Sequence, residues 1–243
     1  GIESMTNAPY LLKKHRSGAR IGHDTAYDHM FLDGLEDAYE AGRAMGTFAQ
    51  DTADAYQLTR EAQDGYAIES LRRAQVAIAD GAFVNEIAPV TVVSRAGETV
   101  VDTDEQPGKG RPDKVPTLNP AFAKDGTITA ATSSSISDGA AALVLTRASV
   151  ADIKGLKPVA TVVAVAAHAQ EPKDFTVAPV GAITKVLDKA GWTLADVELF
   201  EVNEAFAKSL GIAEASVEGL RADIKKNLER EVKFRVLARN KGA

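Results

Sequence analysis

The spacing of apolar residues predicts two consecutive helices between Thr47 and about Asp80. Apolar side chains recur at helical intervals across this range. They are Phe48, Ala55, Leu58, Tyr66, Ala67, Leu71, Ala74 and Ile78. The polar stretch Thr59–Gln63 divides the run. Thr59 is suited to cap the second helix because its hydroxyl can accept a bond from a free amide, and Glu61 suits the positive end of that helix.

Other stretches carry the patterns of strands. Residues 87–93 and 99–101 predict a hairpin that turns near Gly97. Three apolar runs predict strands buried on both faces, and these are residues 140–145, 159–166 and 197–201. Buried strands of this kind need neighbouring strands and covering helices, so the second half of the chain predicts a layered structure.

The remaining stretches predict helices and loops. One helix is expected to open at Ser149 and another to span residues 180–190, so strand and helix alternate as in an α/β protein. Residues 1–46, which glycines interrupt repeatedly, predict loops and short helices. Residues 105–120 are rich in Pro, Gly and Lys and predict a mobile loop.

Composition excludes several classes of protein. With 45% hydrophobic and 26% charged residues, the 243-residue chain can bury a real core. It has no cysteine, which excludes disulfides and thiolate metal sites within these residues, and the spacing of its four histidines is not that of metal ligands. No apolar run is long enough to cross a membrane and no secretion signal is recognised, so a cytoplasmic location is expected.

Charge divides the chain unevenly. Residues 208–243 hold nine Lys or Arg and five Asp or Glu, so their net charge is +4. The net charge of the whole chain is −6, so the first 207 residues carry −10. This change of sign indicates two pieces of different origin or a solvated helix at the end of one domain.

Five stretches together resemble the thiolase family, whose enzymes make or cleave the carbon–carbon bond of a 3-ketoacyl-CoA. Residues 1–10, Gly-Ile-Glu-Ser-Met-Thr-Asn-Ala-Pro-Tyr, are similar to the family's G-M-E-S-M-S-x-A-P segment. Four later stretches match in order, and these are Ala44–Gly46, Leu118–Phe122, Ser134–Ala141 and Asn203–Phe206. The match covers residues 1 to about 207.

The resemblance implies an α/β fold in which this chain is a thiolase-like fragment with a C-terminal helix. Residues 1–134 correspond to the family's loop domain, and residues 135–158 to the end of its N-terminal half. Residues 159–207 correspond to the start of its C-terminal half, and residues 208–243 form a separate helical tail.

The resemblance also implies a mechanism. A cysteine thiolate attacks an acyl thioester, and the acyl group passes to a second, enolised acyl-CoA. Oxyanions form at both steps and are stabilised by two oxyanion holes, while a second cysteine and a G-H-P histidine move protons. Asn203 corresponds to the N-E-A-F asparagine, whose neutral amide holds a water in one of these holes. This chain contains neither of the two cysteines and lacks the G-H-P histidine, so we expect it to be inactive alone.

The family's coenzyme A tunnel corresponds to five positions of this chain. They are Met45, Phe122, Ala130, Ser134 and Ile136. Apolar walls exclude water there, and the Ser134 hydroxyl can bond the amides of the pantetheine arm. Plain core packing is the alternative reading for Met45, Phe122 and Ile136.

Two departures bear on the substrate pocket. Thr132 stands where many relatives have asparagine, and Ala44 where several have histidine, so the acyl-chain preference stays open. Separately, the basic residues Lys109, Arg111 and Lys114 suit the phosphates of coenzyme A or a solvated loop.

The tail resembles a different family. From about residue 205, the sequence is similar to part of trigger factor, the ribosome-associated chaperone and prolyl isomerase. Leu220, Ile224, Leu228 and Val232 recur every four residues after Ser216, a candidate cap, and predict an amphipathic helix. This helix suits a chaperone arm or a cover for a nearby apolar surface. The junction falls where both families have similar sequence, which suggests a chimera.

The sequence therefore predicts an acyltransferase of the acetyl-CoA C-acetyltransferase type, inactive as this chain. The alternative is a non-catalytic coenzyme A-binding or chaperone-like fragment. An acyl-CoA is the expected substrate, and coenzyme A enters as its moiety rather than as a cofactor; no metal is expected. Nucleic acid is not expected as a partner, since acidic residues interrupt the basic tail. A membrane is not expected either, since no apolar run is long enough to cross one. The family implies a homo-oligomer, and this fragment is expected to self-associate.

Overall fold

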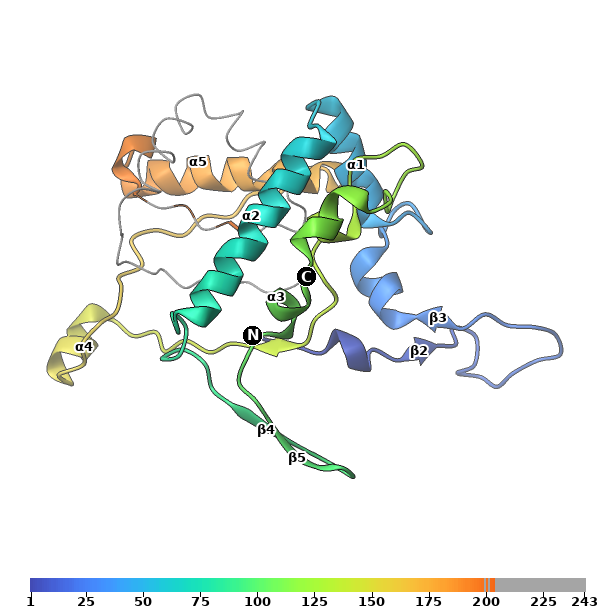
Figure 1. Ribbon diagram of the computed structural model, residues 1–243, viewed down its shortest axis with the longest axis horizontal. Helices are drawn as coiled ribbons and strands as arrows, with labels where there is room; N and C mark the ends of the chain where they lie inside the picture. Colours follow the sequence, from blue (N-terminus) through green and yellow to red (C-terminus); the bar gives the residue numbers. More distant parts are fainter. Residues whose placement is uncertain (199, 201, 204–243) are drawn as a thin grey trace.

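The computed structural model describes residues 1–198, 200 and 202–203 (Figure 1). The α-helices are α1 (Met45–Ala55), α2 (Arg60–Ala79), α3 (Glu105–Lys109), α4 (Ala148–Ile153) and α5 (Ala178–Ala190). The strands are β1 (Ile2–Glu3), β2 (Tyr10–Leu11), β3 (Tyr27–Asp28), β4 (Val90–Ser94), β5 (Gly97–Val101) and β6 (Gly139–Ala140). Short 3-10 or π turns are η1 (Met5–Asn7), η2 (Phe31–Leu35), η3 (Pro112–Thr117), η4 (Ala130–Thr132), η5 (Pro172–Val177) and η6 (Leu194–Asp196). In the described part of the chain, no helix is long and apolar enough to cross a membrane.

The two helices expected between Thr47 and Asp80 are confirmed as α1 and α2. The Thr59 hydroxyl accepts a hydrogen bond of 3.2 Å from the amide of Ala62, so it caps α2 as its position predicts. Helix α1 buries Phe48, Ala49 and Ala53, which are half of the six buried apolar residues in the described part of the chain. Residues 1–44 are mostly loops and the short turns η1 and η2, as expected, together with the two-residue strands β1, β2 and β3.

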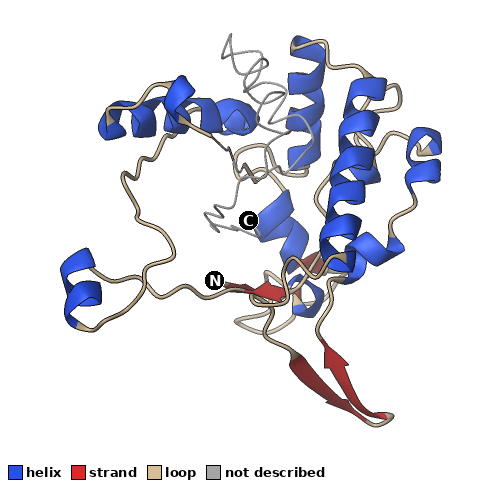
Figure 2. Cartoon of the chain, turned by 60° about the vertical axis from the view of Figure 1, so that its left-hand side comes forward, coloured by secondary structure: helices blue, strands red, loops and turns tan. Residues whose placement is uncertain are grey.

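The predicted hairpin is also confirmed. Strands β4 and β5 pair antiparallel from Val90 opposite Val101 to Ser94 opposite Gly97. The hairpin projects away from the helices (Figure 2), and every residue of both strands is exposed. Gly97 has a φ of +120°, a conformation that suits a residue without a side chain at the turn.

The prediction of a mobile loop over residues 105–120 is wrong. Helix α3 and the 3-10 turn η3 occupy this stretch, and side chains of α2 bond their backbone. The Gln75 amide donates to the carbonyl of Pro107 at 2.8 Å, and the Arg60 guanidinium donates to the carbonyls of Val115 and Leu118 at 3.0 and 2.9 Å. These long-range bonds tie the backbone of the stretch to α2.

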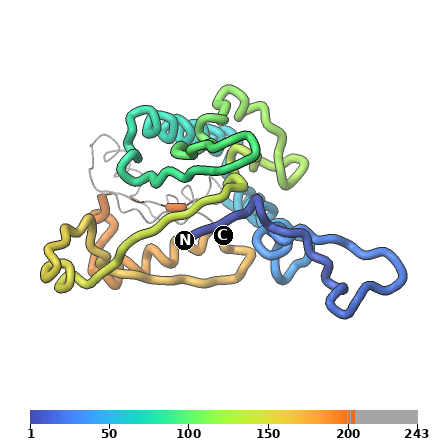
Figure 3. The backbone as a smooth tube through the Cα atoms, turned by 90° about the horizontal axis from the view of Figure 1, so that it is seen from below, coloured from blue at the N-terminus to red at the C-terminus, as the bar shows by residue number. Residues whose placement is uncertain are grey.

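The predicted buried strands at residues 140–145 and 159–166 are absent. Strand β6 ends at Ala140, and the structure assigns no strand to residues 141–147 or 160–171. Both runs lie as long single segments on either side of α4 (Figure 3), with Val144 96% and Val159 89% exposed. A strand needs a hydrogen-bonded neighbour, and beyond the short contact of Ala140 and Ala141 with residues 1–2 no described strand pairs with either run.

Helix α5 confirms the helix expected over residues 180–190 and lies along the second exposed run. The Lys189 ammonium donates to the carbonyl of Val165 at 2.9 Å. The His168 ring lies so close to Gly181 that a Cβ there would be 2.6 Å from it. These contacts place the end of the run and the residues that follow it beside α5, while the valines of the run stay exposed.

The last elements expected from sequence are tested only in part. Residues 197, 198 and 200 are described and none belongs to a strand, so the expected strand is not formed at these positions. Residues 199 and 201 and the tail expected to be helical, residues 208–243, lie outside the described residues.

Candidate functional site

Two of the five residues expected to line the tunnel come together at the start of α1. Met45 is the first residue of the helix and is partly buried. The ring of Phe122 packs on its neighbour Gly46, where a Cβ would lie only 2.2 Å from Phe122 Cε1. A glycine at this position therefore allows the ring to approach the helix backbone, and the contact places Phe122 next to Met45.

A buried network holds the loop that carries Phe122. The Gln50 side-chain oxygen accepts bonds from the amides of Thr127 and Ile128, at 3.0 and 3.2 Å. The Gln63 side chain donates to the Thr127 hydroxyl at 2.8 Å. The loop closes on itself where the Ala121 amide donates to the carbonyl of Ile128 at 2.8 Å. Helices α1 and α2 thus both fix residues 121–128.

The other three expected tunnel residues follow this loop in the chain. Ala130 opens the turn η4, and Ala130, Ser134 and Ile136 are all exposed. Thr132, at the position where many relatives carry asparagine, is only 3% exposed. Its hydroxyl accepts from the Thr129 amide at 2.9 Å and donates to the Thr129 carbonyl. Thr132 therefore holds the turn and does not face solvent.

Asn203 is described and exposed, while Glu201 and Glu204 on either side of it lie outside the described residues. The structure brings Met45 and Phe122 together and places the other three tunnel residues on one short stretch. The sequence analysis did not predict the contact between Phe122 and Gly46.

The three basic residues of the loop each lie beside a carboxylate. The Lys109 ammonium pairs with Glu105. Arg111 and Lys114 lie 3.5 and 4.0 Å from the two oxygens of Asp113. All of these side chains are exposed, so their acidic neighbours offset part of the positive charge that would attract a phosphate.

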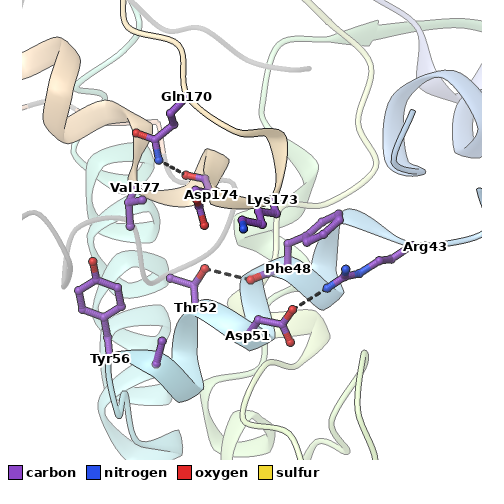
Figure 4. Close-up of a pocket in the computed structure, with 10 residues that line it drawn as sticks. Arg43, Phe48, Asp51, Thr52, Tyr56, Gln170, Lys173, Asp174 and Val177 are labelled. Carbon is purple, nitrogen blue, oxygen red and sulfur yellow. Dashed lines mark hydrogen bonds and ion pairs between the residues drawn. The ribbon is translucent and has the colours of Figure 1, made fainter. Parts of the chain in front are cut away.

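Sequence reasoning missed a pocket of about 470 Å³ between α1 and η5 (Figure 4). Phe48 and Thr52 of α1 and Tyr56 just after it, each four residues apart, line one wall, and Gln170 and η5 contribute the other. The Thr52 and Thr176 hydroxyls join the two walls at 2.8 Å. The spacing of Phe48, Thr52 and Tyr56 was the available signal, because residues four apart share one face of a helix.

Two of the four charged residues that line this pocket pair with each other, and Lys173 pairs with Glu171 outside it. The Arg43 guanidinium lies over the Phe48 ring at 3.7 Å and bonds Asp51 at 2.5 Å and Glu40 at 2.8 Å. The bond to Glu40, with the charges of Glu40 and Asp51, raises the pKa of Arg43. The pocket does not include any of the five expected tunnel residues.

We expect Gly46→Ala to destabilise the fold through the Phe122 contact. The added methyl must displace the ring, and overpacking of this kind costs about 1–3 kcal/mol. Gly65→Ala is the matched control, because Gly65 lies in α2 with open space where a Cβ would stand. That change should stabilise the helix by about 0.5–1 kcal/mol. Thermal unfolding of both variants checks this, and equal midpoints would contradict the packing described for Phe122.

Comparison with known proteins assigns the class of this fold and site. The thiolase N-terminal domain family matches residues 1–149, and the thiolase C-terminal domain family matches residues 156–227. The structure resembles the crystal structure of the Bacillus anthracis acetyl-CoA acetyltransferase with a TM-score of 0.86 and 38% identity, over 92% of this chain and 56% of that one. The architecture is therefore that of an α/β thiolase-like fragment.

The chain belongs to the thiolase family. It is 45% identical over 218 residues to a probable acetyl-CoA acetyltransferase of Dictyostelium discoideum, which covers 89% of this chain and 52% of that protein. It also resembles the Acat5 thiolase of Ascaris suum, solved in complex with coenzyme A, with a TM-score of 0.81, 42% identity and coverage of 89% and 55%. The chain thus spans about half the length of the relatives it matches.

Proposed function

We propose that this chain is the coenzyme A-binding part of a thiolase of the acetyl-CoA C-acetyltransferase type. Whole enzymes of this type transfer an acyl group between coenzyme A thioesters with formation or cleavage of a carbon–carbon bond. The observation that carries the proposal is the similarity, over about nine-tenths of the chain, to proteins named acetyl-CoA acetyltransferases.

The contacts at α1 support a binding role for the five tunnel residues. Met45 and Phe122 offer adjacent apolar surface, which suits the methylene groups of a pantetheine arm. Ser134 offers a hydroxyl on an exposed stretch, which can donate to or accept from the amides of that arm. Asn203 is assigned by the family motif to hold a water at an oxyanion hole.

The proposed chemistry needs a thiolate that these 243 residues do not contain. No cysteine is present, so no acyl–cysteine intermediate can form on this chain itself. We infer that the chain binds coenzyme A and acyl-CoA without turning them over. The homo-oligomer of the family and the cytoplasmic location both stay predictions.

A second candidate is a chimera with a chaperone-like tail. The change of charge after residue 207 favours it. The thiolase C-terminal domain match continues to residue 227, which favours a thiolase origin for part of the same stretch. Long sequencing reads across the codons for residues 200–215 test it, because a continuous genomic sequence would support one gene and a broken one would show an artificial join.

Titration calorimetry with coenzyme A tests the proposed binding. We expect a dissociation constant of about 0.1–1 mM, because only part of a pocket contributes. Ser134→Val removes the hydroxyl at nearly constant volume and should weaken binding, whereas Ser149→Val, at an exposed position on α4, is the matched control. Equal heats for Ser134→Val and the parent chain would remove Ser134 from the site, and no heat for the parent would contradict the proposed function.

A further inference from the structure

Two of the stretches that match the thiolase family meet at a very short ladder. Strand β1 pairs antiparallel with β6, with Ile2 opposite Ala140 and Glu3 opposite Gly139. Gly1 and Ala141 extend it by two bonds of 2.8 Å, one from the Ala141 amide to the Gly1 carbonyl and one from the Gly1 ammonium to the Ala141 carbonyl. A ladder of two residues holds segments together weakly, so other contacts must fix their relative position.

The carboxylate of Asp138 makes such a contact. Its Oδ1 accepts a 3.0 Å bond from the amide of Thr6, and its Oδ2 accepts the Thr6 hydroxyl. These two donors, the hydroxyl first, lower the pKa of Asp138, and Ser4 and Met5 contribute in the same direction. All four donors are neutral, so hydrogen bonding rather than an ion pair stabilises the charged carboxylate. The contact joins residues 132 positions apart in the chain.

This contact lies at one end of the stretch that carries two expected tunnel residues. Residues 134–138 have no regular secondary structure of their own. Before them, the bonds between Thr129 and Thr132 fix η4. At their other end, the Asp138 side chain bonds Thr6. Ser134 and Ile136 therefore lie on a short bridge held at both ends.

We propose that Asp138 is a positioning residue for coenzyme A binding, which acts by clasping Thr6 and so fixing the bridge of residues 134–138. Asp138 itself need not touch the ligand. The inference rests on the proposed function, since it assigns a role to Asp138 in the same candidate site. It predicts that coenzyme A affinity depends on a hydroxyl at residue 6 as well as on the carboxylate at residue 138.

Paired substitutions separate this role from a general loss of structure. Asp138→Asn keeps the shape but loses the charge, and Thr6→Val keeps the shape but loses the hydroxyl. Each should weaken coenzyme A binding about threefold to tenfold, the effect of one charge-assisted bond. Thr6→Ser keeps the hydroxyl and should restore binding to the parental value. Asp152→Asn, at an exposed position on α4, is the control for the loss of a carboxylate and should change nothing.

Hydrogen exchange followed by mass spectrometry, with no ligand present, gives an independent readout. Peptides covering residues 4–8 and 134–140 should exchange faster in Asp138→Asn and Thr6→Val, and at the parental rate in Thr6→Ser. Unchanged exchange in the first two variants would show that the clasp does not exist. Parental affinity together with faster exchange would show a clasp without a role in binding, which overturns the proposal. If the parent does not bind coenzyme A, both this assignment and the proposed function fail, whereas binding by the parent with unaltered variants overturns the assignment alone.

Discussion

The purified 243-residue chain should show no measurable thiolysis of acetoacetyl-CoA and no condensation of acetyl-CoA. Thiolase chemistry divides acyl transfer into two accessible steps by forming an acyl–cysteine intermediate, and this chain has no cysteine to form it. In a serine protease, loss of the nucleophile lowers kcat about a millionfold. The oxyanion hole to which we propose to assign Asn203 cannot replace that contribution, because it would stabilise a charge that never forms without an attacking group.

The measurement is the loss of acetoacetyl-CoA absorbance, with the Bacillus anthracis relative as the positive control. Asn203→Ala in this chain serves as a matched negative control, since both preparations should give the buffer rate. A rate above buffer that is lost in Asn203→Ala would show that the chain turns over substrate by itself and would contradict the account.

Self-association is the second large effect that we expect. The runs at residues 141–147 and 159–166 expose many aliphatic side chains, and no described strand covers them. The second run is Val-Ala-Thr-Val-Val-Ala-Val-Ala and contains neither a charge nor a proline that would oppose pairing with another strand. Exposed apolar patches beyond a few hundred Å² commonly drive association. The chain should therefore elute as mixed oligomers in size-exclusion chromatography with light scattering.

One substitution tests which surface is responsible. Val163→Lys places a charge within the second run and should raise the monomer fraction several-fold, because a charged residue opposes the pairing of exposed strands. Val84→Lys is the matched control, since Val84 is 68% exposed but lies outside both runs. A sharp monomer peak for the parent chain, with cooperative thermal unfolding, would instead mean that these runs are covered.

The elements that the sequence predicted correctly depend on local signals. Helices α1, α2 and α5 follow from apolar spacing, and the cap at Thr59 follows from residue type and position. The hairpin of β4 and β5 also follows from a local signal, because its two strands and turn are adjacent in the chain. In each case, the backbone hydrogen bonds that define the element lie within the stretch that predicts it.

The errors came where distant residues decide the structure. Residues 140–145 and 159–166 carry the composition of buried strands, but composition does not supply the neighbouring strand that makes one. In residues 105–120 the reverse occurred, because Arg60 and Gln75 on α2 order a stretch that reads locally as a loop.

The candidate site shows the same division. The family motifs indicated Met45 and Phe122, but their contact depends on Gly46 and on a loop 76 positions further along the chain. The clasp of Thr6 by Asp138 and the pocket between α1 and η5 likewise join distant segments. The periodicity of a segment does not show which distant segment it contacts. Residue spacing alone therefore could not predict these contacts.

Mass spectrometry of the chain incubated with acetyl-CoA tests most directly whether it binds the thioester without reacting with it. Under native conditions we expect a complex whose mass equals that of the chain plus acetyl-CoA. Under denaturing conditions the same sample should return the mass of the unmodified chain, because no thiolate is present to accept the acetyl group. A denatured chain that carries an acetyl group would show that the chain reacts with the thioester. A native spectrum without the complex would show that the chain does not bind it.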